Sequence, residues 1–416
     1  MPSGAGQAAS VQATTSQPRL AEPASIAADP VQERTGQQET KPSPMRDATS
    51  SMDPGNRHAL TAPIATVAPE PGQRRGILLA NLGTPASPAV ADVRRYLGEF
   101  LMDRHVLDVP WLLRKLIVSC FILPFRPKNS AEAYASIWTS EGSPLLLESE
   151  ALKQALGSSL DDEMPVALGM RYGEPSLASA VAELRDAGVD EILLVALYPQ
   201  HAASTRTTCI EAVEALLPAG VRLTVLPPFY NDPQYIDALA ASVRPYLAED
   251  WDHLLLSYHG LPERHLTKAD PTGSHCLQSG HCCETPSPAQ ATCYRHQVYA
   301  TSSALQAALE LPNERVTTSF QSRLGRLPWL TPYTDQVLKE LPTRGVQKLL
   351  VACPAFVADN LETLEEIAIQ GEETFIEAGG ESLTMVPCLN ADPAWVQVLA
   401  DWCAPQHRVE PLRLMN

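Results

Sequence analysis

One histidine in the second half of the chain occupies a position at which imidazole chemistry is expected. His259 ends the apolar run LLLSYH and is followed by Gly260 and by the turn-forming Pro262. Ligands of open parallel α/β sheets bind beyond the carboxyl ends of the strands, and a neutral imidazole there can accept a proton or bind a metal ion. Most lone histidines are structural, so the neighbours of His259 must decide its role.

A row of carboxylates follows a second candidate strand end. In the stretch CPAFVADNLETLEEIAIQGEETF, the acids Asp359, Glu362, Glu366 and Glu373 recur at spacings of three, four and seven residues, which predicts one face of a helix. A solvated acidic face is the alternative. Because His259 ends the matching strand, we favour a site for a divalent cation that is held and then released. Imidazole and carboxylates bind Fe(II) less tightly than thiolates would.

Four of the nine cysteines fall in one loop that prolines and glycines interrupt, with the spacing C-x5-C-C-x9-C. The other five are scattered in apolar surroundings, as is typical of a reducing cytoplasm, so the cluster indicates a metal site rather than disulfides. Zinc prefers paired C-x2-4-C ligands, which the loop lacks, whereas a [2Fe–2S] cluster needs four thiolates. We predict a [2Fe–2S] cluster, with zinc or no metal as alternatives, on Cys276, Cys282, Cys283 and Cys293.

Alternative ligands exist within the same loop. Three histidines could replace a thiolate, and the adjacent Cys282 and Cys283 need not both bind. The three histidines are His275, His281 and His296.

The elements that must position these residues alternate along the chain. From Gly76 onward, short β-branched runs alternate with amphipathic stretches, which predicts βαβ units and a doubly wound parallel sheet. Three segments of the first half are echoed in the same order in the second, for example DEILLVALYPQ by QKLLVACPAF. The chain is therefore expected to be α/β with two similar Rossmann-like domains. We place them at 75–245 and 246–416, with a cysteine-rich insert at 270–296.

The first 74 residues differ from the rest in composition. Residues 1–74 are rich in Ala, Gln, Ser, Thr and Pro and contain no aromatic residue, which predicts a disordered low-complexity leader. A secretory signal would need an apolar core, and a transit peptide should be poor in acids, so neither fits. Met45 and Met52 leave a later start of translation open.

Composition also argues against several classes of function. With 48 acids, 31 bases and a formal net charge of −17, the chain lacks the basic character of a nucleic-acid binder. No glycine-rich dinucleotide fingerprint or Walker phosphate loop follows a predicted strand, which argues against nicotinamide and nucleotide chemistry. The most apolar stretch, Trp111 to Phe125, contains Arg114 and Lys115 and is too short to span a membrane. It could instead contact a bilayer surface, line an apolar pocket or pack as a core helix.

Five motifs in order resemble the ferrochelatases, which insert Fe(II) into protoporphyrin IX to form protohaem at the end of haem synthesis. They are GILLANLGTPASPAVADVRRYLGEFLMDRHV, LYPQHAASTRTT, SYHGLPERH, TSFQSRLGRLPWLTPYTD and FVADNLETLEEI, and the resemblance runs from about Gly76 to Trp402. It implies a porphyrin held between the two domains. Rival interpretations are a chelatase for coproporphyrin or another tetrapyrrole or metal, and a non-catalytic iron–sulfur sensor on this scaffold.

The resemblance also implies roles for single residues. It makes His259 and Glu362 the catalytic residues and the ligands of the substrate Fe(II), with Asp359 and Glu366 as an accessory acidic path. Many members have histidine two positions before that glutamate, whereas this chain has Asn360. In the expected mechanism, packing bends the macrocycle while His259 accepts pyrrole protons.

Further expectations concern the porphyrin rim, the cluster and the surroundings. Tyr96 and Arg104 are expected to contact the porphyrin, and the Trp111–Phe125 stretch to form the lip of its pocket.

Some ferrochelatases carry a [2Fe–2S] cluster. The position of the additional ligand in the animal type is Ala203 here, so the resemblance favours the type whose cluster ligands lie in an internal cysteine loop. A monomer or homodimer in the cytoplasm is expected, with peripheral contact at the inner membrane.

Overall fold

The first half of the chain folds around a parallel sheet of four strands in the order β2-β1-β3-β4. Every residue of β3 is buried and β1 is nearly so, because helices cover both faces of the sheet. The strands are β1 (Arg75–Gly83), β2 (Val166–Tyr172), β3 (Glu191–Ala196) and β4 (Arg222–Val225).

The second half repeats this topology in a second parallel sheet, with the order β6-β5-β7-β8. Each strand has a counterpart at the same place in the first sheet, β5 corresponding to β1 and β7 to β3. The predicted class, α/β with two similar doubly wound sheets, is therefore confirmed. The strands are β5 (His253–His259), β6 (Val316–Gln321), β7 (Lys348–Ala352) and β8 (Ser382–Met385).

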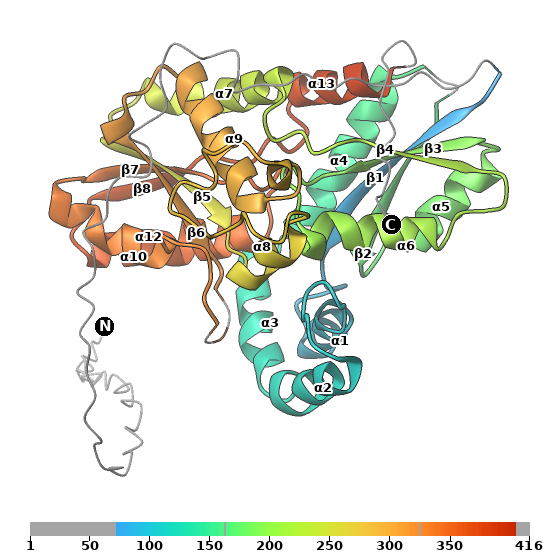
Figure 1. Cartoon of the computed structure of the whole chain (residues 1–416), viewed down its shortest axis with the longest axis horizontal. Coiled ribbons are helices and arrows are strands. Elements are labelled where there is room, and N and C mark those ends of the chain that lie inside the picture. The colour runs from blue at the N-terminus through green and yellow to red at the C-terminus, as the bar shows by residue number, and fades with distance from the viewer. Residues whose placement is uncertain (1–71, 162–163, 324, 326, 405–416) are drawn as a thin grey trace, which may run out of the picture. The chain divides into compact units, whose positions relative to one another are not determined.

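The computed structural model describes residues 72–161, 164–323, 325 and 327–404 (Figure 1). The predicted leader lies almost wholly outside these residues, and the domain boundaries stay a prediction. The helices of the first half are α1 (Val90–Leu101), α2 (Trp111–Leu116), η2 (Ile117–Ile122), α3 (Arg126–Ile137), α4 (Pro144–Ser159), α5 (Leu177–Asp186), η3 (Ala203–Thr207), α6 (Thr208–Glu214) and α7 (Pro233–Leu247).

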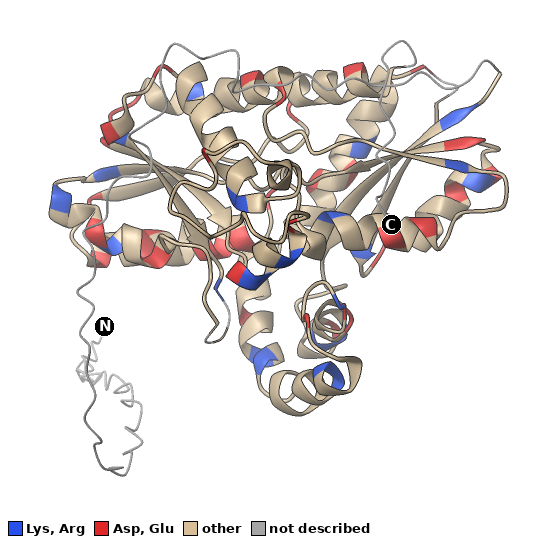
Figure 2. Cartoon of the chain, viewed as in Figure 1, with Lys and Arg blue, Asp and Glu red and all other residues tan. Residues whose placement is uncertain are grey.

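Helices of the second half connect its strands in the same way, and α13 returns to pack against α4 and α7 of the first half (Figure 1). They are α8 (Glu263–Ala269), η4 (Pro288–Ala291), α9 (Tyr294–Ala308), η5 (Asn313–Arg315), α10 (Thr334–Glu340), η6 (Pro342–Arg344), α11 (Leu361–Thr363), η7 (Leu364–Ile369), α12 (Gln370–Glu377) and α13 (Pro393–Cys403). Figure 2 shows acidic residues gathered on α10 and α12.

The largest hydrophobic core joins the two sheets. Successive strand residues point to opposite faces, so Leu79 of β1 and Leu256 of β5 both enter this shared core together with Trp395 of α13. Their neighbours Leu78 and Leu255 face two separate outer cores, one for each sheet. Because both halves share one core, the strand ends of the two sheets are held by common packing.

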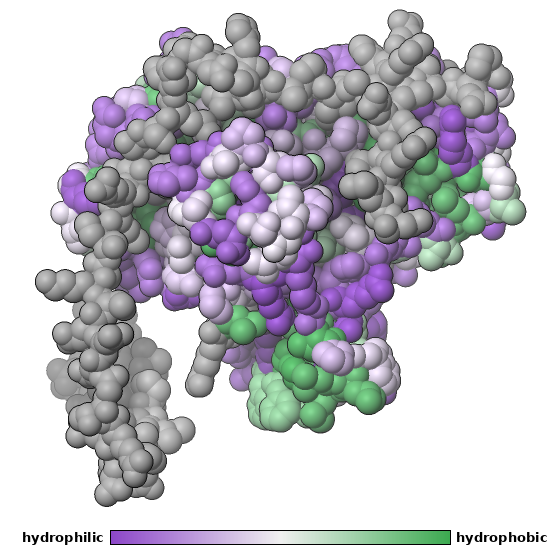
Figure 3. Space-filling view, viewed as in Figure 1, coloured by the Kyte–Doolittle hydropathy of each residue, from purple (hydrophilic) through white to green (hydrophobic). Residues whose placement is uncertain are grey.

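An excursion between β1 and β2, formed by α1, α2, η2 and α3, has its own small core, against which Leu361 of α11 packs (Figure 1). Several large apolar side chains of this excursion are nevertheless exposed and form the apolar area in the lower part of Figure 3. They are Trp111, Leu112, Leu113, Leu116, Phe121 and Phe125. No helix among the described residues is long and apolar enough to cross a membrane.

Candidate active site

His259 is the last residue of β5 and is half-buried. Its Nδ1 lies 2.6 Å from the carbonyl oxygen of Gly260. Because a carbonyl oxygen only accepts hydrogen bonds, Nδ1 donates its proton in this contact. The indole of Trp329 lies beside the imidazole, with ring centroids 6.5 Å apart. Nε2 is therefore the ring nitrogen that takes no part in the contact with Gly260.

Glu362 stands in the first turn of α11, which Asn360 caps. The side-chain oxygen of Asn360 accepts a hydrogen bond from the N–H of Thr363 at 3.1 Å, and the hydroxyl of Thr363 accepts one from the N–H of Asn360 at 3.1 Å. Asparagine is among the strongest N-cap residues, so the residue that replaces the family's histidine starts the helix that carries Glu362.

The carboxyl group of Glu362 interacts electrostatically with His259. Burial raises the pKa of Glu362; His259 opposes this rise, and Glu366 adds to it. The structure therefore brings together three of the residues predicted from the sequence, His259, Glu362 and Glu366. A carboxyl group with a raised pKa gives up a bound cation more readily than a permanently ionised one.

Gln321, which sequence reasoning missed, connects the two strand ends. It pairs with His259 across β5 and β6, and its side-chain amide donates to the carbonyl of Glu362 at 2.7 Å. Its side-chain oxygen accepts a hydrogen bond from Ser257 at 2.7 Å. The next residue, Ser322, donates its backbone N–H to Glu366 at 2.7 Å. The strand-end position of the motif FQSR was the available signal.

Asp359 lies apart from the helical row in which it was expected. The helix begins at Leu361, and the wider π-helical turn η7 then changes the angular spacing of the residues that follow. Asp359 is buried and accepts hydrogen bonds from Asn390 at 2.8 Å and from the N–H of Cys388 at 3.2 Å. Its carboxylate thus fixes the turn before α11, and its place in an acidic path stays a prediction.

Glu365 continues the acidic row instead, which the sequence pattern did not indicate. Burial raises its pKa, a hydrogen bond from Gln370 opposes the rise, and the charges of Glu366 and Glu373 add to it. Glu373 is exposed on α12. The carboxylates therefore extend from Glu362 towards the surface through Glu366 and Glu365.

Two buried tyrosines of the α1–α3 excursion stand near Glu362. The ring of Tyr96 meets that of Tyr134 edge-on, with centroids 6.2 Å apart. Burial raises the pKa of both hydroxyls, and Glu362 contributes to each rise. Tyr96 donates its hydroxyl to the carbonyl of Gly83 at 3.0 Å. Tyr134 was not predicted from the sequence, and porphyrin contact by Tyr96 stays a prediction.

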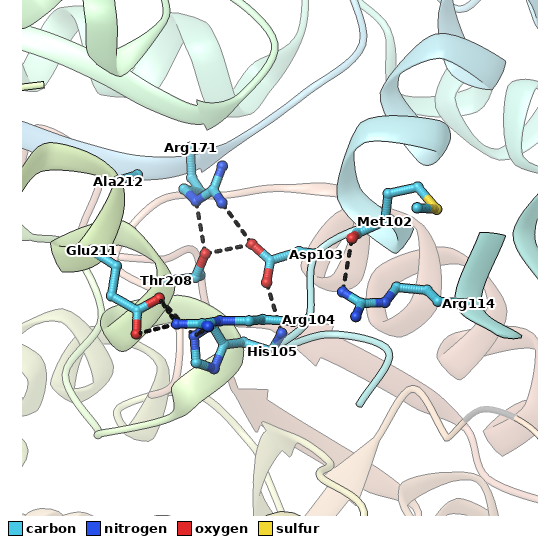
Figure 4. A pocket seen from close by; sticks show the side chains of 9 residues that line it. All are labelled: Met102, Asp103, Arg104, His105, Arg114, Arg171, Thr208, Glu211 and Ala212. Carbon is cyan, nitrogen blue, oxygen red and sulfur yellow. Dashed lines mark hydrogen bonds and ion pairs between the residues drawn. The ribbon is translucent and has the colours of Figure 1, made fainter. Parts of the chain in front are cut away.

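Arg104 is not brought into the group around His259. Its exposed guanidinium lies 2.9 Å from each carboxylate oxygen of Glu211, which also meets the ring of His105 at 2.9 Å (Figure 4). These residues line a separate cavity of about 390 Å³, together with Met102, Asp103, Arg114, Arg171, Thr208 and Ala212. Porphyrin contact by Arg104 likewise stays a prediction.

The four clustered cysteines converge in space. Cys276, Cys282 and Cys293 are buried and Cys283 is half-buried. Cys293 is the N-cap residue of α9, without a side-chain capping hydrogen bond. Its pKa falls to about 6 chiefly because the thiol of Cys283, and less strongly that of Cys276, stabilises its thiolate, which outweighs burial. Burial and the neighbouring Cys293 raise the pKa of Cys276 to about 12.

Hydrogen bonds hold the cysteine loop around these thiols. Asp270 accepts the backbone N–H groups of His275 at 2.8 Å and of Cys276 at 2.9 Å. The rings of His275 and His296 contact the carbonyls of Cys282 and Cys283 at 2.7 and 2.8 Å, so they already have hydrogen-bonding roles. The four thiols, which affect one another's pKa values, are therefore the donors that an iron–sulfur cluster would use.

The comparison with known families decides the family of the chain. The family model for ferrochelatase matches residues 74–407. The chain belongs to the ferrochelatase family. It is 54% identical over 331 residues to a ferrochelatase of Pseudomonas fluorescens (strain Pf0-1), covering 79% of this chain and 96% of that protein. A ferrochelatase of Ectopseudomonas mendocina (strain ymp) is also 54% identical, over 79% of this chain and 98% of that protein.

Among solved structures, SirB from Bacillus subtilis with Fe3+ superposes with a TM-score of 0.46 and 11% identity, covering 81% of this chain and 100% of that one. This structural similarity is too low to assign a family, so the family assignment rests on the sequence matches alone. The ferrochelatase resemblance seen in the five motifs is thereby confirmed. Within the described part of this ferrochelatase-family chain, no group of three or more His, Cys, Asp or Glu is placed to hold one metal ion, and the [2Fe–2S] cluster stays a prediction.

Proposed function

We propose that this chain is a ferrochelatase, a lyase that inserts Fe(II) into protoporphyrin IX to form protohaem, with His259 and Glu362 as its catalytic residues. The observation that carries the assignment of the residues is the meeting of the His259 imidazole with a carboxyl group of raised pKa beyond the strand ends of one sheet. Membership of the ferrochelatase family supports the reaction.

His259 acts as the proton acceptor. A free-base porphyrin must lose two pyrrole protons before its four nitrogens can all bind iron. The Nδ1 proton of His259 is engaged by the carbonyl of Gly260, so Nε2 is the nitrogen to which we assign the acceptance of a pyrrole proton. Each proton then leaves through the carboxyl groups, which exchange protons with solvent at the exposed end of the row.

Glu362 takes part in delivering the substrate Fe(II). Imidazole and carboxylate oxygen together bind Fe(II), and the raised pKa of Glu362 keeps that binding weak enough for release. Glu366 and Glu365 continue the row, and exposed Glu373 marks its outer end. We assign these acids to an accessory path for cations or protons, which Asp359 supports by fixing the turn before α11.

The porphyrin is bound next to His259, between the aromatic groups of the two halves. Trp329 supplies a flat surface beside the imidazole, and Tyr96 and Tyr134 supply a rigid one beside Glu362. Rigid walls on both sides would bend the macrocycle and expose its nitrogen lone pairs. Arg104 is assigned to a propionate, for which it would exchange its contact with Glu211.

The test of the active site is His259→Ala. We expect loss of iron insertion, followed anaerobically as the appearance of haem absorption, with an unchanged circular dichroism spectrum. His281→Ala is the matched control, because that imidazole is 79% exposed and contacts only Glu284 among the interactions described. Near-normal turnover of His259→Ala would sink the assignment. Parallel assays with coproporphyrin decide between the two porphyrins.

The cysteine loop is assigned to a [2Fe–2S] cluster held by Cys276, Cys282, Cys283 and Cys293. When bound, such a cluster supplies a one-electron redox centre and a covalent link between the segments that hold it. The four converging thiols support this assignment. Anaerobically purified protein should show visible cluster absorption, with two iron and two sulfide per chain; a colourless protein with one zinc would replace the cluster by zinc.

The exposed apolar side chains of α2, of η2 and of the turn that follows η2 are assigned to peripheral contact with the cytoplasmic face of the inner membrane. Leu112 is 75% exposed, Phe125 73% and Phe121 67%, and several large exposed apolar side chains on one segment are typical of an interaction surface. Sedimentation with anionic phospholipid vesicles should carry the wild-type chain down and leave the double variant Phe121→Ser/Phe125→Ser in solution.

The chain is expected to be a monomer or a homodimer. Light scattering after size-exclusion chromatography distinguishes the two.

A further inference from the structure

The helix that begins at the cysteine loop also touches the backbone of the active-site histidine. Cys293 is the N-cap residue of α9, and its side chain makes no capping hydrogen bond. The next residue, Tyr294, is buried, with 7% of its surface exposed. Its hydroxyl donates a hydrogen bond of 2.8 Å to the carbonyl oxygen of His259.

That hydrogen bond is one of two that fix a single peptide group. The carbonyl of His259 is held by Tyr294, and the N–H of Gly260 in the same peptide group donates to the carbonyl of Gln321 at 2.8 Å. Because a peptide group is planar, both contacts together fix its orientation. The oxygen that accepts from Nδ1 of His259 belongs to the next peptide group, so fixing the first group restricts the backbone from which that oxygen is placed.

The surroundings of Gly260 leave the peptide little freedom to adjust. A Cβ atom at Gly260 would lie 2.8 Å from the carbonyl oxygen of Gln321 and 3.2 Å from the ring of Trp329. A shift of the peptide towards β6 would therefore cause a clash. Movement away from β6 is opposed by Tyr294 alone among the hydrogen bonds described for this carbonyl.

We propose that Tyr294 is a positioning residue for His259 and that a metal cluster on the cysteine loop, by holding Cys293 at the start of α9, keeps Tyr294 in place. The inference rests on the cluster proposed above. A residue covalently linked to metal through its N-terminal neighbour cannot move without moving that ligand. In the absence of metal, core packing of Cys293 and Tyr294 and hydrogen bonds such as that from the hydroxyl of Thr292 to the carbonyl of Ala269 still hold this end of the helix, and the cluster would add to them.

Such a support would account for the presence of the cysteines in the connection between β5 and β6, which begins directly after His259. The chain leaves the sheet at His259, forms α8 and the cysteine loop, and returns through α9 along β5. Each additional contact between α9 and β5 fixes the same strand end. The cluster would then act as a structural support for catalysis, without an electron-transfer step.

Two matched hydroxyl deletions test the inference. Tyr294→Phe and Tyr258→Phe each remove one buried hydroxyl contact between β5 and α9, because the hydroxyl of Tyr258 meets that of Ser302 at 2.9 Å. Only Tyr294→Phe releases the peptide beside His259. We expect kcat for iron insertion to fall about tenfold in Tyr294→Phe with little change in KM for protoporphyrin, since small misplacements of catalytic groups are costly. Cluster absorption should be unchanged in both variants.

Amide hydrogen exchange gives a second measurement that does not depend on turnover. We expect the segment 258–262 to exchange faster in Tyr294→Phe than in Tyr258→Phe, and faster in wild-type protein from which metal has been removed by a chelator than in the loaded protein. Equal kcat and equal exchange in the two variants would overturn the positioning role. Exchange that is unaffected by metal removal would overturn the role of the cluster.

The proposed function fails in a different way. A wild-type chain that makes no haem contradicts the chelatase, whatever the exchange data show. A wild-type chain that contains neither iron with sulfide nor zinc contradicts the cluster and the part of the inference that depends on it, whereas the comparison of Tyr294→Phe with Tyr258→Phe still decides the positioning role.

Discussion

Two carboxylates, one that follows α1 in the first half and one on α11 in the second, have opposite environments. In the first half, burial would raise the pKa of Asp103, but hydrogen bonds from Thr208 and from the N–H of His105, with the charge of Arg171, lower it. In the second half, burial raises the pKa of Glu362, and the opposing charges of His259 and Arg126 do not cancel the rise. One fold thus contains a permanently paired acid and an acid that can exchange its proton or cation.

The comparison shows what turns a partly buried acid into a reactive site. Asp103 lies 2.6 Å from Arg171 and 3.0 Å from the hydroxyl of Tyr172, so all its hydrogen-bonding capacity is used within the protein. Glu362 is held through its backbone carbonyl by Gln321 instead, which leaves the carboxyl group available for the role proposed above. The two halves share one topology, but the side chains that contact Asp103 and Glu362 differ. The first acid therefore serves stability, and the second is available for the proposed chemistry.

The largest effect is expected from Glu362→Gln. Amide replaces acid with the same shape, so iron insertion should fall by roughly 10²- to 10⁴-fold, the usual contribution of a group that transfers protons. The free energy of unfolding should be unchanged or higher, because an uncharged group is favoured at this site. Steady-state kinetics and urea denaturation measure the two quantities.

Glu373→Gln is the control for that experiment, since Glu373 is exposed at the outer end of the acidic row. Its turnover should stay within about twofold of wild type, as is usual for surface changes. Equal losses in Glu362→Gln and Glu373→Gln would mean that the net charge of the row matters and not the proton of Glu362.

Asp103→Asn should have the opposite effects, a loss of stability with little change in turnover. Removing one charge of a partly buried pair leaves Arg171 without a counter-ion and should lower the free energy of unfolding by about 2–4 kcal/mol. Turnover per folded molecule should change little. Urea denaturation gives the first quantity, and kinetics at a temperature well below the unfolding midpoint gives the second. A stable but inactive variant would contradict the contrast between the two sites.

The two acids should affect stability in opposite directions as pH changes. The pKa of Asp103 is lowered in the folded state, so its contribution is complete above the ordinary pKa of aspartate and is lost as pH falls through the lowered value. The pKa of Glu362 is raised, so its ionised form destabilises the fold above the raised value, and this cost disappears as pH falls below the ordinary glutamate range.

Differences in unfolding free energy between wild type and the two variants, measured by urea denaturation from pH 7.5 to about pH 4, check this. The advantage of Glu362→Gln over wild type should shrink as pH falls, and the deficit of Asp103→Asn should persist until pH falls below the usual range of aspartate. If the difference in unfolding free energy from wild type changed with pH in the same way for both variants, Asp103 and Glu362 would not differ electrostatically as described.

The smallest effect is expected from Asn360→Ala, which removes the cap of α11. Loss of an N-cap asparagine costs about 1 kcal/mol, and the turnover should fall by a few-fold because Glu362 stands in the first turn of that helix. Asn360→Ser, which keeps a capping oxygen, should recover most of both losses. If Asn360→Ala retains full stability, the capping role is wrong.

Much of the fold could be predicted from the sequence, because its signals are local. Buried runs such as EILLVA of β3 and KLLVA of β7, separated by amphipathic stretches, indicate parallel strands wherever they occur. The position of His259 at the end of such a run could also be predicted, whereas Glu362 lies ten residues beyond the end of β7 at Ala352 and was assigned from the family resemblance. Helix boundaries were less certain: Asp359 was counted into a helix that begins two residues later, at Leu361.

The sequence by itself determined the two matching α/β halves, the family, and the strand ends at which chemistry could occur, because hydrophobic period and motif order are properties of neighbouring residues. Only the tertiary structure decided which polar groups are paired. Gln321 reaches Glu362, Tyr294 reaches His259, and Arg104 meets Glu211 across long stretches of chain. Such contacts depend on how sheets and helices pack, and packing brings together residues whose separation in sequence carries no signal of their meeting.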